Sequence, residues 1–72
     1  MKVGDRVWAK AIYEGRDISG IGTIRSIEQH VEGAAYSVMF DKPFGDFNGC
    51  FVEPYKEGEI IRPLTKLDHI LK

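Results

Sequence analysis

The chain has 72 residues, of which 43% are hydrophobic and 29% charged, and its formal net charge is −1. This length and composition predict one soluble globular domain, residues 1–72, with a small core, and the charge offers no general attraction to nucleic acid. A single cysteine, Cys50, excludes an internal disulfide framework and a zinc cage of several cysteines. We expect a cytoplasmic protein, because the sequence shows neither an apolar leader nor an apolar run long enough to span a bilayer.

The first predicted strand is residues 6–11. Its residues alternate, with Val7, Ala9 and Ala11 on one face, as in a strand that is buried on one side. The stretch that follows, residues 13–22, reads YEGRDISGIG and is interpreted as a long hairpin loop, because glycine permits backbone angles that other residues resist.

The second predicted strand is residues 22–28, with the sequence GTIRSIE. Ile24 and Ile27 are three residues apart, which breaks the alternation and predicts a β-bulge or a strong bend. Residues 29–34 then form a tight connection.

The third predicted strand, residues 35–41, alternates cleanly and places Tyr36, Val38 and Phe40 on one face. It leads into residues 41–49, DKPFGDFNG, which are interpreted as a second long loop because proline, glycine and asparagine interrupt them.

Two short strands and a helical turn are predicted for the remainder. Residues 50–54 and 59–62 form the strands, each ended by a proline. From Pro63 onward apolar residues recur at helical spacing, which predicts a short C-terminal helical turn that covers one end of the fold. These apolar residues are Leu64, Leu67, Ile70 and Leu71.

An all-β chain with five short strands, a long first loop, a strand opening GIGTI and a closing helical turn resembles the SH3-like small β-barrel superfold. This resemblance implies a five-stranded SH3-like barrel over nearly the whole chain. Three branches of the superfold are similar at the level of motifs.

The segments VGDRVWAK, YEG, GTIRSIE, YSVMFD and LTKLDHI resemble the Tudor-like branch, in which aromatic residues form a cage for a methylated side chain. The resemblance implies cage positions at Tyr13, Phe40, Phe44 and Phe47. The stretch GDRVWAKAIYEGRDISGIGTIRSIE resembles the KOW-like branch, which implies binding to nucleic acid or the ribosome.

The ending GEIIRPLTKLDHI resembles small barrels that assemble into rings, such as the type II dihydrofolate reductases. That family carries an active-site glutamine and tyrosine on its fifth strand, where this chain has Ile60 and Arg62. Reductase activity is therefore not implied, and the resemblance to this branch implies only a homo-oligomer that binds a small ligand.

Aromatic residues in predicted loops and at strand ends form the first candidate site. Loops on a rigid scaffold commonly carry binding, so these residues predict a groove that accepts a protein partner. It would lie between the first and third loops, residues 13–22 and 41–49. Packing of the same rings into a small core is the structural alternative. The predicted partner-binding residues are Tyr13, Arg16, Phe44, Phe47 and Tyr55.

A basic face around Trp8 forms the second candidate site. Trp8 shares a face of the first strand with Arg6 and Lys10, and an indole between cations suits stacking on bases. With Arg25, and with Arg16 from the first loop, these residues predict a nucleic-acid-binding stripe. The structural alternative is that Trp8 packs beneath the basic side chains.

The sequence does not favour an enzyme. His30 and His69 lie far apart and lack metal-ligand spacing, so no metal site or cofactor is predicted. Cys50 has the neighbours of a buried strand residue, and no catalytic residues are assigned. We therefore expect a small non-catalytic accessory protein of a bacterium or phage that binds a protein, with nucleic-acid binding as the first alternative and a homo-oligomer as the second.

Overall fold

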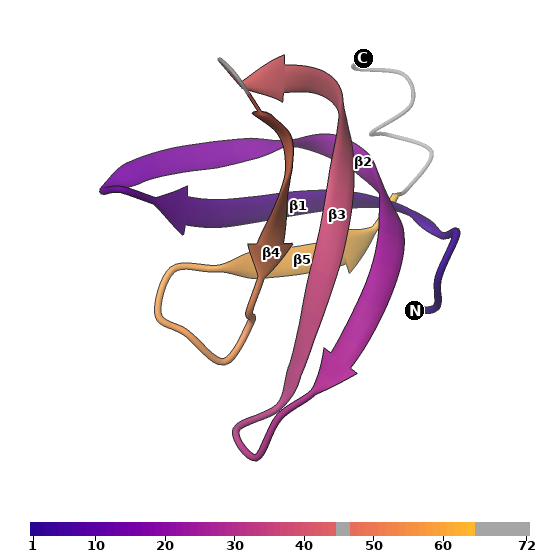
Figure 1. Cartoon of the computed structure of the whole chain (residues 1–72), viewed down its shortest axis with the longest axis vertical. Helices are drawn as coiled ribbons and strands as arrows, with labels where there is room; N and C mark the ends of the chain where they lie inside the picture. Colours follow the sequence, from indigo (N-terminus) through magenta and orange to yellow (C-terminus); the bar gives the residue numbers. More distant parts are fainter. Residues whose placement is uncertain (45–46, 65–72) are drawn as a thin grey trace.

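Antiparallel strands form a single sheet in the computed structural model, which describes residues 1–44 and 47–64, with only the backbone of residues 44, 47 and 48. The five strands are β1 (Arg6–Tyr13), β2 (Arg16–Gln29), β3 (Ala34–Phe44), β4 (Phe47–Val52) and β5 (Ile60–Pro63). Their order in the sheet is β4-β3-β2-β1-β5 (Figure 1). The all-β prediction is confirmed, since the described residues contain no helix.

The first predicted loop is wrong, because almost all of it belongs to the β1–β2 hairpin. Tyr13 lies opposite Arg16, and only Glu14 and Gly15 separate the two strands. Both turn residues have positive φ, 50° at Glu14 and 77° at Gly15. A two-residue turn of this kind matches the twist of the flanking strands, so a tight hairpin replaces the long loop.

Gly22 serves a different purpose from the turn glycine. It lies opposite Phe40 of β3, and a Cβ atom on it would come within 2.5 Å of the Met39 carbonyl oxygen. Glycine is needed here because the backbone of β3 approaches closely. The sequence alone does not distinguish this role from that of a loop.

The predicted bulge in β2 is confirmed. The β2–β3 register shifts between Ile24 and Ser26, which leaves Arg25 unpaired in the ladder. Residues 16–23 of β2 pair with β1, while residues 22–29 pair with β3. Figure 1 shows the result: β2 bends, so that β1 and β5 run across β3 and β4.

The second predicted loop is also wrong over most of its length. β3 extends to Phe44 and β4 begins at Phe47, and the backbones of these two residues are paired. The register between β3 and β4 is irregular between Met39 and Phe44, and such an irregularity accommodates Pro43 within a strand.

The predicted start of the C-terminal helical turn is wrong as well. Pro63 is the last residue of β5 and lies opposite Val7 of β1. β5 is an edge strand, where proline is tolerated because one side of the strand makes no ladder bonds. The remainder of the predicted turn, residues 65–72, lies outside the described residues.

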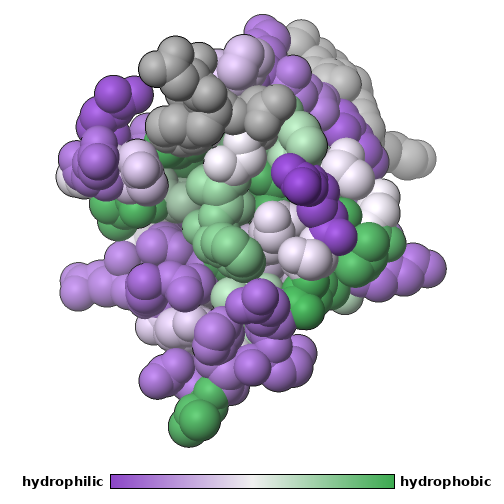
Figure 2. Space-filling view, in the orientation of Figure 1, coloured by the Kyte–Doolittle hydropathy of each residue, from purple (hydrophilic) through white to green (hydrophobic). Residues whose placement is uncertain are grey.

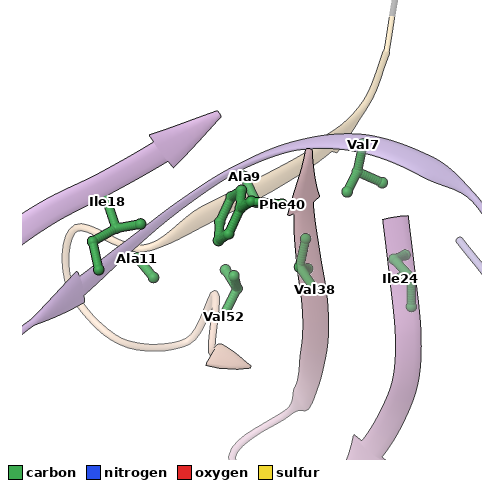
Figure 3. Close-up of a cluster of buried hydrophobic side chains, with 8 residues drawn as sticks. All are labelled: Val7, Ala9, Ala11, Ile18, Ile24, Val38, Phe40 and Val52. Carbon is green, nitrogen blue, oxygen red and sulfur yellow. The ribbon is translucent and has the colours of Figure 1, made fainter. Parts of the chain in front are cut away.

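The core is small and wholly apolar, and among the described residues no polar or charged side chain is buried. The predicted alternation of β1 is confirmed, since Val7, Ala9 and Ala11 are at most 2% exposed. Figure 3 shows the Phe40 ring between Ala9 and Val52. The eight residues of the cluster are Val7, Ala9, Ala11, Ile18, Ile24, Val38, Phe40 and Val52.

Candidate functional site

A groove of about 430 Å³ lies between the end of β1, β4 and the connection from β4 to β5. Its walls are residues 11–13 of β1, residues 49–51 of β4, and three charged residues of the connection. The groove forms because the sheet curls without closing, since β4 and β5 are its two ends and no pairing joins them in the described part of the chain.

Large apolar side chains gather at this groove without being buried. Ile12, Tyr13 and Phe51 line it and are 42%, 49% and 50% exposed. Figure 2 shows green and pale-green atoms over β4, with purple atoms around them. Apolar side chains that stay exposed together in this way mark an interaction surface more often than single exposed ones do.

The wall formed by the β4–β5 connection is held by hydrogen bonds and an ion pair. The Glu53 amide donates to Oε1 of Glu59 at 2.7 Å, and the Tyr55 hydroxyl donates to Oε1 of Glu53 at 3.1 Å. Lys56 forms an ion pair with Glu53, and this contact holds the pKa of the Glu53 carboxyl below its usual value. The connection therefore presents a fixed, charged border to an apolar groove.

Cys50 lies inside the groove but is poorly suited to act as a nucleophile. Burial, followed by the negative charge of Glu59, raises the pKa of its thiol to about 11. Cys50 is therefore almost wholly protonated at neutral pH, and it reacts poorly because the thiolate is the reactive form.

The predicted partner-binding residues do not all meet at this groove. Tyr13 lines it, whereas Arg16 and Tyr55 lie outside its lining. Tyr55 belongs to the β4–β5 connection, and its ring packs against the β2–β3 turn, with its centroid 6.3 Å from that of His30. The side chains of the two predicted phenylalanines, Phe44 and Phe47, lie outside the described part of the structure.

Sequence reasoning missed Ile12 and Phe51 as groove residues. Phe51 is in β4, between the buried or part-buried Cys50 and Val52, so alternation alone assigns it to the opposite face. Alternation therefore predicts that Phe51 is exposed, but its place in the groove depends on β4 being an edge of the sheet, for which alternation carries no signal.

The basic residues of β1 share one face, as predicted, but acidic residues neutralise them. Arg6 donates to Asp41 at 2.7 and 2.5 Å and to Thr23 at 2.9 Å. Lys10 lies 3.6 Å from a carboxylate oxygen of Asp17.

Trp8, on the same face, is covered in part by Arg62 of β5, whose guanidinium carbon is 5.1 Å from the ring centroid. Arg16 and Arg25 do not continue the row of basic residues on β1. Arg16 lies opposite Tyr13, which strand alternation places on the other face from Trp8, and Arg25 is at the bulge of β2. The five residues therefore do not form the single stripe that would favour nucleic-acid binding.

Two further features are absent from residues 1–44 and 47–64. This part of the chain contains no group of three or more His, Cys, Asp or Glu side chains arranged to hold a metal ion. It also contains no helix with the length and apolar character needed to cross a membrane.

Comparison with known proteins gives no further guide to the site. The chain matches no protein-family model, no curated protein and no solved structure. Its function is therefore argued from the geometry of the groove and of the β1 face.

Proposed function

We propose that this chain is a small SH3-like barrel module without catalytic activity, and that it binds a protein partner through the groove between β1 and β4. The observation that carries the proposal is the convergence of Ile12, Tyr13 and Phe51, each exposed over about half of its side chain, on one concave site. The strongly bent five-stranded sheet supports the small-barrel interpretation.

The energetics favour such a role. Fully burying one large apolar side chain contributes roughly 1.5 to 3 kcal/mol, so covering the exposed halves of three contributes about 3 kcal/mol. This is enough to anchor a peptide segment whose backbone and polar groups supply the rest. A groove bordered by a strand edge is also a common way to recognise an extended peptide.

Selection from a displayed library of random peptides, followed by titration of an enriched peptide, tests the proposal. We expect Tyr13→Ser and Phe51→Ser each to weaken binding about fivefold, since each removes an apolar contact worth about 1 kcal/mol. The matched control is Val31→Ser, because Val31 is fully exposed and lies outside the groove lining. Equal affinity in wild type and both groove variants would overturn the proposal.

Nucleic-acid binding by the β1 face has weaker support, because Asp41 and Asp17 partner two of its cations. A homo-oligomer with β5 at its centre has no specific contact in its favour.

A further inference from the structure

We propose that the segment bound in the groove is an extended basic peptide, which pairs as an added strand with the free edge of β4 and places a Lys or Arg side chain beside Glu59. This inference rests on the proposed function of the groove and adds the chemical class of its ligand.

The first observation is that β4 is an edge strand. It pairs with β3 on one side, and in the described part of the chain no strand pairs with its other side. The backbone N–H and C=O groups along such an edge offer a ladder of hydrogen bonds to an incoming extended segment. Residues 49–51 of this edge line the groove, so an added strand would lie against the apolar side chains.

The second observation is that the two edges of the sheet differ in their protection against pairing with a further strand. β5 is four residues long, contains Arg62 and ends in Pro63, and charge and proline both discourage strand pairing. β4 is six residues long, with the sequence FNGCFV, and has neither a charge nor a proline. β4 is therefore the edge that remains competent to accept a strand.

The third observation is the charge of the groove. Its charged lining is Glu53, Lys56 and Glu59, so one cation faces two carboxylates. Lys56 forms its ion pair with Glu53. Glu59 accepts a hydrogen bond from the Glu53 amide, and its charge adds to the Glu53 contact in raising the pKa of Lys56. Among the described residues, however, no cation forms a direct ion pair with Glu59. Two carboxylates thus share one cation, so the charged lining is net negative, and Glu59 is the carboxylate without a direct ion pair.

The position of this charge suits a long basic side chain. The carboxylate of Glu59 lies near enough to Cys50 to raise the pKa of the thiol, so its field reaches the interior of the groove. Lys and Arg have apolar stems and charged ends, which match an apolar groove with a carboxylate at its border. An acidic side chain placed there would be repelled.

The test uses the full chain and the peptides enriched by display selection. We expect the enriched sequences to share a Lys or Arg, and replacing that residue by Gln in a synthetic peptide to weaken binding about tenfold. Glu59→Gln should weaken binding of the basic peptide to the same degree and that of the Gln peptide little. Gln retains an oxygen that accepts the Glu53 amide, so this variant removes charge while keeping the hydrogen bond.

Glu57→Gln is the matched control, because Glu57 is exposed in the same connection and does not line the groove. Peptides methylated on alternate backbone nitrogens test strand addition separately. Methylation of the set that faces β4 should abolish binding, whereas methylation of the other set should leave it unchanged.

Equal effects of Glu59→Gln and Glu57→Gln, or equal effects of the two methylation patterns, would overturn this inference. If binding then still depends on Phe51, the proposed function stands and only the ligand class fails. If binding is also indifferent to Phe51→Ser and Tyr13→Ser, both fail. A chain that sediments as a dimer through the β4 edge, and whose dimer persists at saturating peptide, would have a second copy on that edge, which also overturns the inference.

Discussion

Arg62 of β5 lies over the ring of Trp8 of β1, with its guanidinium carbon 5.1 Å from the ring centroid. The two residues are opposite each other in the β1–β5 ladder, so the contact is a cross-strand pair. β5 joins the sheet by only four paired residues, and this stack adds to the packing of Ile61 against the core in holding the last strand in place.

Removal of this stack should destabilise the fold. We expect Arg62→Ala to lower the free energy of unfolding by about 1 kcal/mol, through loss of the cation–π contact and of the covering side-chain stem. Urea unfolding followed by Trp8 fluorescence measures the change. Arg62→Lys keeps a cation over the ring and should lose less than Arg62→Ala; equal stability of all three proteins would show that the contact contributes nothing.

The Glu53–Lys56 ion pair should make stability depend on pH. Because the pair lowers the pKa of Glu53 below its ordinary value of 4.5, its contribution is present above pH 4.5 and is lost as the pH falls through the folded-state pKa. We expect Lys56→Gln to be less stable than wild type at pH 7 and equally stable below the folded-state pKa of Glu53. NMR titration of the Glu53 carboxyl should show a higher pKa in the variant, and an unchanged titration midpoint would contradict the contact.

Cys50 should react slowly with alkylating agents. Its pKa of about 11, against an ordinary 9.0, lowers the thiolate fraction near neutral pH about a hundredfold, and the greater nucleophilicity of a more basic thiolate offsets part of that loss. We expect iodoacetamide to modify the folded chain about tenfold more slowly than the urea-unfolded chain at pH 8, or slower still where burial restricts access.

The control for this reaction is Glu59→Gln, which removes the charge that adds to the raised pKa. This variant should react faster than wild type while folded and at the same rate when unfolded. Identical rates in the two folded proteins would show that Glu59 does not act on the thiol.

Much of the fold follows from the sequence pattern, because alternation has a direct physical cause. An apolar residue that alternates with polar neighbours in a half-buried strand faces the core. This pattern predicted the burial of Val7, Ala9 and Ala11 and the strand around Val38. The interrupted spacing of Ile24 and Ile27 likewise predicted the bulge.

The loops and the groove could not be predicted in the same way. Glycine serves both a turn that needs positive φ and a strand that another backbone approaches, and composition does not separate these roles. The groove depends on how far the sheet curls and on which strands remain edges. These are properties of the whole sheet, so the place of Phe51 in the groove could not be inferred from its neighbours in the sequence.

The two roles of glycine lead to different expected costs of substitution. A Cβ atom added to Gly15 would meet nothing within 4 Å, but the φ of this residue is 77°, so Gly15→Ala should cost about 1 kcal/mol of backbone strain and Gly15→Asn much less. At Gly22 the added Cβ would be 2.5 Å from the Met39 carbonyl oxygen and 2.8 Å from Cγ1 of Val38. Because the nearest atom belongs to the backbone of a paired strand, it cannot move aside by a rotamer change.

Gly22→Ala should therefore destabilise the chain by about 3 kcal/mol, which is most of the stability available to a domain of this size. Urea unfolding of wild type, Gly15→Ala and Gly22→Ala gives the ranking, and circular dichroism shows whether the Gly22 variant folds at all. Should Gly15→Ala prove the more damaging, the turn rather than the close approach of β2 and β3 would be the point at which glycine is indispensable.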